Sequence, residues 1–169
     1  KIASGEYIAF CDCDDLWKKT KLDQQIKFMK NLEIDFCFTA YEVINEQESK
    51  IGLRQAQNKL NFDDLIKSCD IGLSTVILKK DLFSNPNYRF ANLKTKEDYV
   101  LWLKLAKDGI LLNGLDENLV SWRKNKNSLS SSVTQKIIDG FRVYNSYLKF
   151  NIFKSIICLL ILSINSVSR

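Results

Sequence analysis

The sequence contains no histidine, a single proline and no Cys-x-x-Cys pair. The absence of histidine excludes histidine acid–base catalysis, a Ser-His-Asp triad and histidine-ligated zinc in this chain. Carboxylates must therefore carry out any proton transfer. The cysteines are odd in number, and their spacing predicts reduced, mostly buried thiols of a cytosolic protein at Cys11, Cys13, Cys37, Cys69 and Cys158.

An apolar run long enough to cross a bilayer is also absent. The longest such run, Ile152 to Ile164, is interrupted by Lys154 and falls short of the roughly 20 residues that spanning requires. Residues 123–169 carry a net charge of +7, whereas residues 1–122 carry −2. A basic and apolar tail of this kind suits an anionic membrane surface, an ordinary core helix or a helix that holds a partner, and the pattern leaves all three open.

The composition is that of one globular domain with a core of its own. The chain has 169 residues, of which 46% are hydrophobic and 27% charged. Hydrophobic periodicity predicts an α/β fold. Strands are expected near residues 7–11, 35–44, 71–78 and 118–123, and helices near 21–31, 61–68, 96–108, 133–148 and 152–164.

The first predicted strand ends in a cluster of acidic residues. Asp12, Asp14 and Asp15 follow the apolar run Tyr7 to Cys11. Ligands of open α/β sheets bind outside the carboxyl ends of strands, and Mg²⁺ and Mn²⁺ prefer oxygen ligands. The pattern therefore indicates either a cation site that meets a phosphate or a solvated turn that ends the strand.

A second acidic pair opens the best-defined helix. Thr95 and Lys96 precede Glu97 and Asp98, and the apolar face of this helix continues to the expected left-handed cap at Gly109. At the third helical position, Asp98 would cap a backbone amide and interact favourably with the helix dipole. The pattern alone favours this structural role over catalysis and excludes neither.

Three stretches resemble signatures of the family 2 glycosyltransferases, the inverting group with a GT-A-type fold. Residues 3–17, which include Asp12-Cys13-Asp14-Asp15, are similar to the segment that holds the DXD motif. Residues 96–109 resemble the second signature, ED-x-x-x-W-x-x-x-A. Residues 122–130 resemble the YR-x-H-x-x-S-x-S loop, with Trp122 in place of tyrosine and Asn125 in place of histidine.

The resemblance implies a metal-dependent transfer of a sugar from a nucleotide-sugar donor to an acceptor hydroxyl. Asp14, with Asp12, is expected to hold Mg²⁺ or Mn²⁺, and Asp12 and Arg123 to lie near the donor diphosphate. Asp98 is expected to be the general base, with Glu97 beside it at the acceptor side. The acceptor is expected to be a glycan or a lipid-linked glycan of a bacterial surface polysaccharide, and no nucleic-acid partner is expected.

The resemblance also predicts how the chain is organised. Residues 1–132 are expected to form the C-terminal portion of a GT-A-like domain with a mostly parallel, Rossmann-like sheet. Residues 133–169 are expected to form a helical extension associated with a membrane. Because Lys1 closely precedes a buried strand, the N-terminal nucleotide-binding part is expected to be missing. The expected location is the cytoplasm, peripheral at the inner face of the cell membrane if the tail binds lipid.

Two other functions compete with this one. A truncated transferase fragment would be inactive and act only by packing or by binding a membrane. A haloacid dehalogenase-like phosphatase also places Asp-x-Asp after a strand, with the first aspartate as nucleophile. The motif of those phosphatases continues with x-[TV], whereas Asp15-Leu16 follows here.

Overall fold

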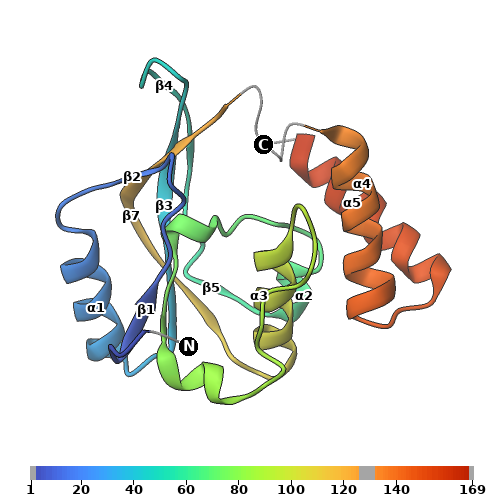
Figure 1. Ribbon diagram of the computed structural model, residues 1–169, viewed down its shortest axis with the longest axis horizontal. Coiled ribbons are helices and arrows are strands. Elements are labelled where there is room, and N and C mark those ends of the chain that lie inside the picture. The colour runs from blue at the N-terminus through green and yellow to red at the C-terminus, as the bar shows by residue number, and fades with distance from the viewer. Residues whose placement is uncertain (1–2, 126–131, 168–169) are drawn as a thin grey trace.

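The computed structural model describes residues 3–125 and 132–167. In this part of the chain, one sheet of seven strands lies between two layers of helices, and two further helices lie outside the second layer (Figure 1). The strands are β1 (Tyr7–Ala9), β2 (Leu16–Trp17), β3 (Phe36–Ile44), β4 (Lys50–Arg54), β5 (Lys59–Leu60), β6 (Ile77–Lys79) and β7 (Leu112–Arg123). The main order across the sheet is β1-β6-β3-β7-β2, with β4 paired to β3 and β5 to β7.

The expectation of a mostly parallel sheet is wrong. Among the described strands only β3 and β7 pair in parallel, and every other pair is antiparallel. Parallel neighbours need a crossover of a dozen or more residues, and α3 (Glu97–Lys107) lies within the connection from β3 to β7. The hairpin from β3 to β4 is too short for such a crossover. The resulting sheet is mixed.

Helix α3 is the most deeply buried element. Its side chains from Tyr99 to Leu103 are almost fully removed from solvent. The indole of Trp102 packs edge-on against Phe36 of β3, with ring centroids 5.0 Å apart. On the other face of the sheet lies α1 (Lys21–Leu32), and α2 (Phe62–Leu65) lies beside α3 (Figure 1). The helix that carries the Glu97-Asp98 pair is therefore fixed by the core.

The C-terminal helices pack onto α2 and α3. Helix α4 (Val133–Arg142) continues through a π-helical turn, Val143–Tyr147, and α5 (Ile152–Val167) follows. The Tyr144 hydroxyl donates to the Ile66 carbonyl oxygen at 2.8 Å, and Asn165 Nδ2 donates to the Lys67 carbonyl oxygen at 2.9 Å. Tyr144 belongs to the same apolar core as Trp102. The division at residue 132 into two units stays a prediction.

The helices lie close to the ranges that the sequence predicted, and the capping contacts at their first residues differ from helix to helix. Asn61 and Asp64 form a capping box, and the Ser132 side chain accepts from the Gln135 amide. Thr20, by contrast, makes no side-chain cap at α1. The strand expected over 71–78 is confined to β6, because residues 73–75 form a 3-10 turn.

The cysteines depart from the expectation in one respect. All five thiols are free, as predicted, but only Cys37 and Cys158 are buried, whereas Cys11, Cys13 and Cys69 are exposed. Among the described residues, no helix is long and apolar enough to span a membrane.

The close approach of residues 55–58 to β7 depends on a glycine. A Cβ at Gly114 would lie 2.0 Å from the Gln57 carbonyl oxygen, so the backbone itself would have to move. Replacing Gly114 with alanine is therefore expected to lower the free energy of unfolding by about 1–3 kcal/mol or more, as overpacked sites do. Urea denaturation measures the change. Gly52→Ala is the control, because its Cβ would meet Val43 at an ordinary 3.6 Å; equal stability of the two variants would contradict the prediction.

Candidate active site

Ser74 accepts two hydrogen bonds, one from the turn that follows β1 and one from the next strand, β2. The Asp12 amide donates to Ser74 Oγ at 2.9 Å, and Trp17 Nε1 donates to the Ser74 carbonyl oxygen at 2.9 Å. The Asp15 amide closes the turn onto the Asp12 carbonyl oxygen at 3.2 Å. Ser74 lies in the 3-10 turn before β6 and carries no sequence signal for this role.

The end of β7 holds the same turn from the other side. The Arg123 amide donates to Asp15 Oδ1 and Arg123 Nε to the Asp14 carbonyl oxygen, both at 2.9 Å. Arg123 also forms an ion pair with Glu48 at 2.9 Å. Arg123 therefore lies at the acidic turn, where it contacts the backbone of Asp14 and not its carboxylate.

Asn125 contacts the carboxylate that was expected to hold the metal. Its Nδ2 donates to Asp14 Oδ2 at 2.7 Å. Asn125 occupies the histidine position of the YR-x-H-x-x-S-x-S loop, which is how the sequence indicated it. The substitution keeps a polar contact to Asp14.

Asp98 lies at the start of α3 in a partly buried position. The helix begins at Glu97, so Asp98 is its second residue and not its third, and Asp98 Oδ1 accepts from the Tyr99 amide at 2.7 Å. Burial raises the pKa of Asp98 to about 7, and repulsion from Glu97 adds to the rise. The Tyr99 amide and the Lys96 ammonium oppose this rise in pKa. A carboxyl group with a pKa near neutrality can exchange protons at physiological pH.

The two acidic clusters lie close enough for their charges to interact. Burial raises the pKa of Asp12, and the charges of Asp14 and Glu97 raise it further. Asp12 in turn is among the charges that raise the pKa of Asp98. The fold thus brings the turn after β1 and the start of α3 within electrostatic range, although a long stretch of chain separates them.

Asp12 and Asp14 suit a divalent cation whose remaining ligands come from water and from the phosphates of the substrate. Within residues 3–125 and 132–167 no group of three or more acidic, cysteine or histidine side chains is arranged to hold a metal. Mg²⁺ commonly uses one or two carboxylates and completes its shell with water and phosphate oxygens. Asp12 and Asp14 match that arrangement, and their repulsion would be relieved by a cation. The metal site stays a prediction.

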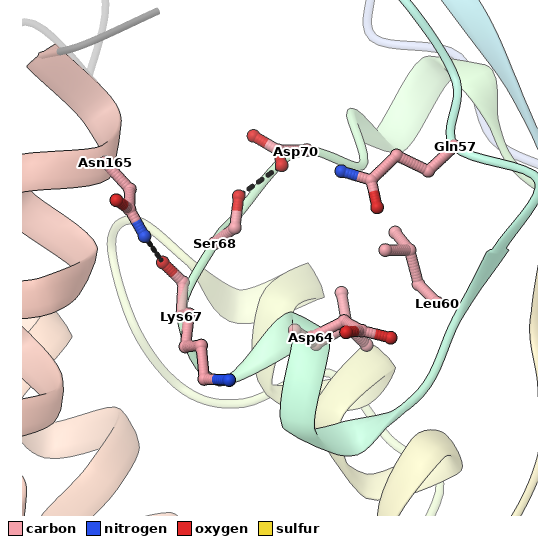
Figure 2. Close-up of a pocket in the computed structure, with 8 residues that line it drawn as sticks. Gln57, Leu60, Asp64, Lys67, Ser68, Asp70 and Asn165 are labelled. Carbon is pink, nitrogen blue, oxygen red and sulfur yellow. Dashed lines mark hydrogen bonds between the residues drawn. The ribbon is translucent and has the colours of Figure 1, made fainter.

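A polar pocket lies next to this site but does not contain it. A pocket of about 190 Å³ lies between α2, the β5 region and the end of α5, and Figure 2 shows Asn165 at its α5 side and Ser68 hydrogen-bonded to Asp70. A second hollow of about 390 Å³ shares Gln57, Leu60 and Asp70 with it. None of the predicted site residues lines either hollow.

Cys69 belongs to the acidic site, although its neighbours Ser68 and Asp70 line the pocket. The charges of Lys96, Asp98 and Glu97 all act on the Cys69 thiol. Cys69 is therefore a neighbour of the predicted base that sequence patterns did not indicate.

Comparison with known proteins identifies the class. Residues 1–86 match the family described as glycosyl transferase family 2. The chain belongs to this family, which confirms the resemblance and excludes the phosphatase interpretation.

Individual relatives narrow the comparison. The chain is 30% identical to the putative teichuronic acid biosynthesis glycosyltransferase TuaG of Bacillus subtilis over 99% of this chain and 66% of that protein. It is 34% identical to the Escherichia coli UDP-Glc:alpha-D-GlcNAc-diphosphoundecaprenol beta-1,3-glucosyltransferase WfaP, over 100% of this chain and 65% of WfaP. The chain therefore spans about two thirds of the length of these relatives.

A solved structure supports the fold. The chain superposes on Staphylococcus aureus TarS 1–349 in complex with UDP-GlcNAc with a TM-score of 0.66 and 18% sequence identity, covering 93% of this chain and 47% of TarS. The fold is GT-A-like, as the sequence signatures predicted, with a mixed sheet in place of the expected parallel one.

The proton affinity of Asp98 can be measured directly. We expect its carboxyl carbon to titrate near pH 7 by NMR, and Glu97→Gln to lower this pKa because one repulsive charge is removed. Because the folded-state pKa exceeds the ordinary aspartate value of 3.8, the free energy of unfolding should fall as pH rises from about 4 to 7. Glu117→Gln, on an exposed part of β7, is the control. An Asp98 that titrates near 4 would contradict the prediction.

Proposed function

We propose that this chain carries out inverting, metal-dependent transfer of a sugar from a nucleotide-sugar to an acceptor hydroxyl, in the assembly of a bacterial surface polysaccharide. The observation that carries the proposal is the position of Asp98. It is a carboxyl group with a pKa of about 7, and it lies within electrostatic range of Asp12, which is in turn within range of Asp14.

Asp98 acts as the general base. Its pKa near neutrality gives it more basicity than an ordinary aspartate, which favours removal of a proton from the acceptor hydroxyl. The Tyr99 amide holds Oδ1, so Oδ2 receives the proton. Glu97 raises the proton affinity of Asp98 by repulsion from the acceptor side. As the proton leaves, the acceptor oxygen attacks the anomeric carbon from the face opposite the leaving group, which inverts that carbon.

Asp12 and Asp14 would hold the divalent cation beside the diphosphate of the donor. When bound, Mg²⁺ or Mn²⁺ supplies positive charge that stabilises the departing nucleoside diphosphate. Asn125 orients the Asp14 carboxylate, and Ser74 and Arg123 fix the backbone around it. These contacts keep the acidic turn in place, so that the two substrates are held in line for attack.

The names of the relatives suggest the substrates. WfaP is named for a UDP-Glc donor and an alpha-D-GlcNAc-diphosphoundecaprenol acceptor, and the matched TarS structure contains UDP-GlcNAc. We therefore propose a UDP-sugar as the donor and a glycan carried on a lipid diphosphate as the acceptor.

Transfer can be tested by release of UDP in the full protein that contains this chain. Asp98→Asn and Asp14→Asn are each expected to lower kcat by about 10²–10⁴, because the base or the metal ligand is lost. The wild-type rate should require Mg²⁺ or Mn²⁺ and should rise with pH through about 7, as Asp98 ionises.

The matched control is Asp23→Asn, which removes the same charge from exposed α1 on the other face of the sheet. An Asp98→Asn enzyme with an undiminished rate would refute the assignment of the base. Transfer that persists unchanged in a chelator would refute the role of the metal.

The exposed face of α5 supports a membrane location. Large apolar side chains recur along one face of this helix at Ile152, Phe153, Ile156, Ile157, Leu160, Ile161 and Ile164, and Phe153 is 81% exposed. Residues 123–169, which include α5, hold the excess positive charge of the protein. An apolar face beside positive charge fits the headgroup region of an anionic bilayer. We propose that α5 binds this surface, where a lipid-linked acceptor resides.

Flotation with liposomes tests this location. The double variant Phe153→Ser, Ile157→Ser is expected to lose most of its binding to phosphatidylglycerol vesicles, because it removes two exposed apolar groups of the face. The double variant Leu22→Ser, Leu32→Ser removes two exposed apolar side chains from α1 and should bind as the wild type does. Equal binding of both variants would place the contact elsewhere.

A further inference from the structure

Three lysines from separate elements gather beside the acidic site. Lys96 immediately precedes α3, Lys124 follows β7, and Lys136 lies on α4. Lys136 lies within electrostatic range of the other two ammonium groups, which lower its pKa in addition to the larger effect of burial. We call Lys96, Lys124 and Lys136 the basic cluster.

A buried carboxylate holds α4 against the start of α3. Asp139 is fully buried, and its Oδ2 accepts from the Thr95 amide at 3.0 Å and from Thr95 Oγ1 at 3.1 Å. The next residue, Gly140, lies so close to Lys96 that a Cβ there would be 3.7 Å from Lys96 Cε. Lys136 is one helical turn before Asp139 and Gly140, hence on the same face of α4. The packing of α4 therefore places Lys136 near Lys96.

The backbone at Lys96 is unusual for a lysine. Its φ of 65° lies in the left-handed region, which is unfavourable for a residue with a side chain. Its Nζ stands 5.7 Å from the centre of the Tyr99 ring. This conformation directs the lysine at the entrance of α3 toward α4.

None of the three lysines forms an ion pair with a described residue, although Lys96 lies within electrostatic range of Asp98. The ion pairs found among the described residues join Lys79 to Asp35, Arg123 to Glu48 and Arg142 to Asp139, and none of them includes a lysine of the basic cluster. Like charges held together repel one another, and a bound anion would relieve this repulsion.

The cluster borders the proposed base and not only the acidic turn. Lys96 is two residues before Asp98, and Lys124 lies between Arg123 and Asn125, both of which contact Asp14. Lys136 belongs to the α4–α5 unit, which carries the exposed apolar face. An anion held here would contact both the segment that carries the proposed base, through Lys96, and the α4–α5 unit, through Lys136.

We propose that Lys96, Lys124 and Lys136 bind the diphosphate of a lipid-diphosphate-linked acceptor. This inference rests on the proposed function, because it says where the diphosphate of the proposed acceptor binds. An acceptor sugar at Asp98 has its diphosphate about one sugar ring away, and its lipid then continues toward α5 and the bilayer. Ammonium groups bind phosphate oxygens through charge-assisted hydrogen bonds. The donor diphosphate, in contrast, is assigned to the cation at Asp12 and Asp14.

Calorimetry with farnesyl diphosphate in EDTA tests the site in the full protein without turnover. We expect the wild type to bind this probe and to bind farnesol much more weakly. The triple variant Lys96→Gln, Lys124→Gln, Lys136→Gln should bind farnesyl diphosphate at least about tenfold more weakly, since each lost contact to a charged group costs roughly that factor. The corresponding triple arginine variant should retain binding, because it keeps the charge.

The controls separate this site from non-specific attraction and from the donor site. Lys19→Gln, Lys27→Gln, Lys107→Gln changes the net charge equally at exposed positions and should leave affinity unchanged. Asp12→Asn, Asp14→Asn should not weaken binding, because it removes negative charge and no phosphate contact, and UDP should not displace the probe.

Several results would overturn the proposal. Equal affinity of the wild type and the triple glutamine variant would show that the cluster binds no diphosphate. Displacement of the probe by UDP would assign the cluster to the donor. Since this assay needs neither a sugar nor a metal, loss of the site would be distinguished from failure of Asp98 as the base, which is measured by UDP release.

Discussion

Repulsion between partly buried carboxylates is the constraint on which this site depends. Asp98 is held at the start of α3 by the Tyr99 amide, close to Glu97 and in range of Asp12. A free chain would separate Asp12 from Glu97 and Asp98, so the folded core must hold these charges together. Trp102 and its neighbours fix α3, while Ser74 and Arg123 fix the turn after β1. Holding Asp98 there lowers the free energy of unfolding at neutral pH, and in return the protein has a carboxyl group that exchanges protons near pH 7.

The charges around the site are segregated by origin. Acidic groups come from the turn after β1 and from the first turn of α3, whereas the basic cluster comes from the edges of α3 and β7 and from α4. Asp139 joins the two regions, because it ties α4 to Thr95 just before the acidic pair. The C-terminal helices are thus attached to the segment that carries the proposed base. A surface that positions α5 would also position the basic cluster.

The fold shows where reasoning from local pattern succeeds. The apolar face of α3 and the cap at Gly109 depend on residues a few positions apart, and both were predicted correctly. The direction of the strands was predicted wrongly. Whether β6 pairs parallel or antiparallel with β1 and β3 depends on the path of the whole chain segment that connects them. The strand expected over residues 71–78 gave way to a 3-10 turn, which carries the Ser74 contacts to the acidic turn.

The sequence by itself determined the family, the acidic residues of both signatures and the chemistry that the absence of histidine leaves available. These follow from residue identity and spacing along the chain. Only the tertiary structure decided that Asp12 lies in range of Asp98, that Asn125 contacts Asp14, and that Lys136 lies near Lys96. Each of these pairs joins segments far apart in the sequence, and their distances depend on how the sheet and the helices pack, which no local pattern encodes.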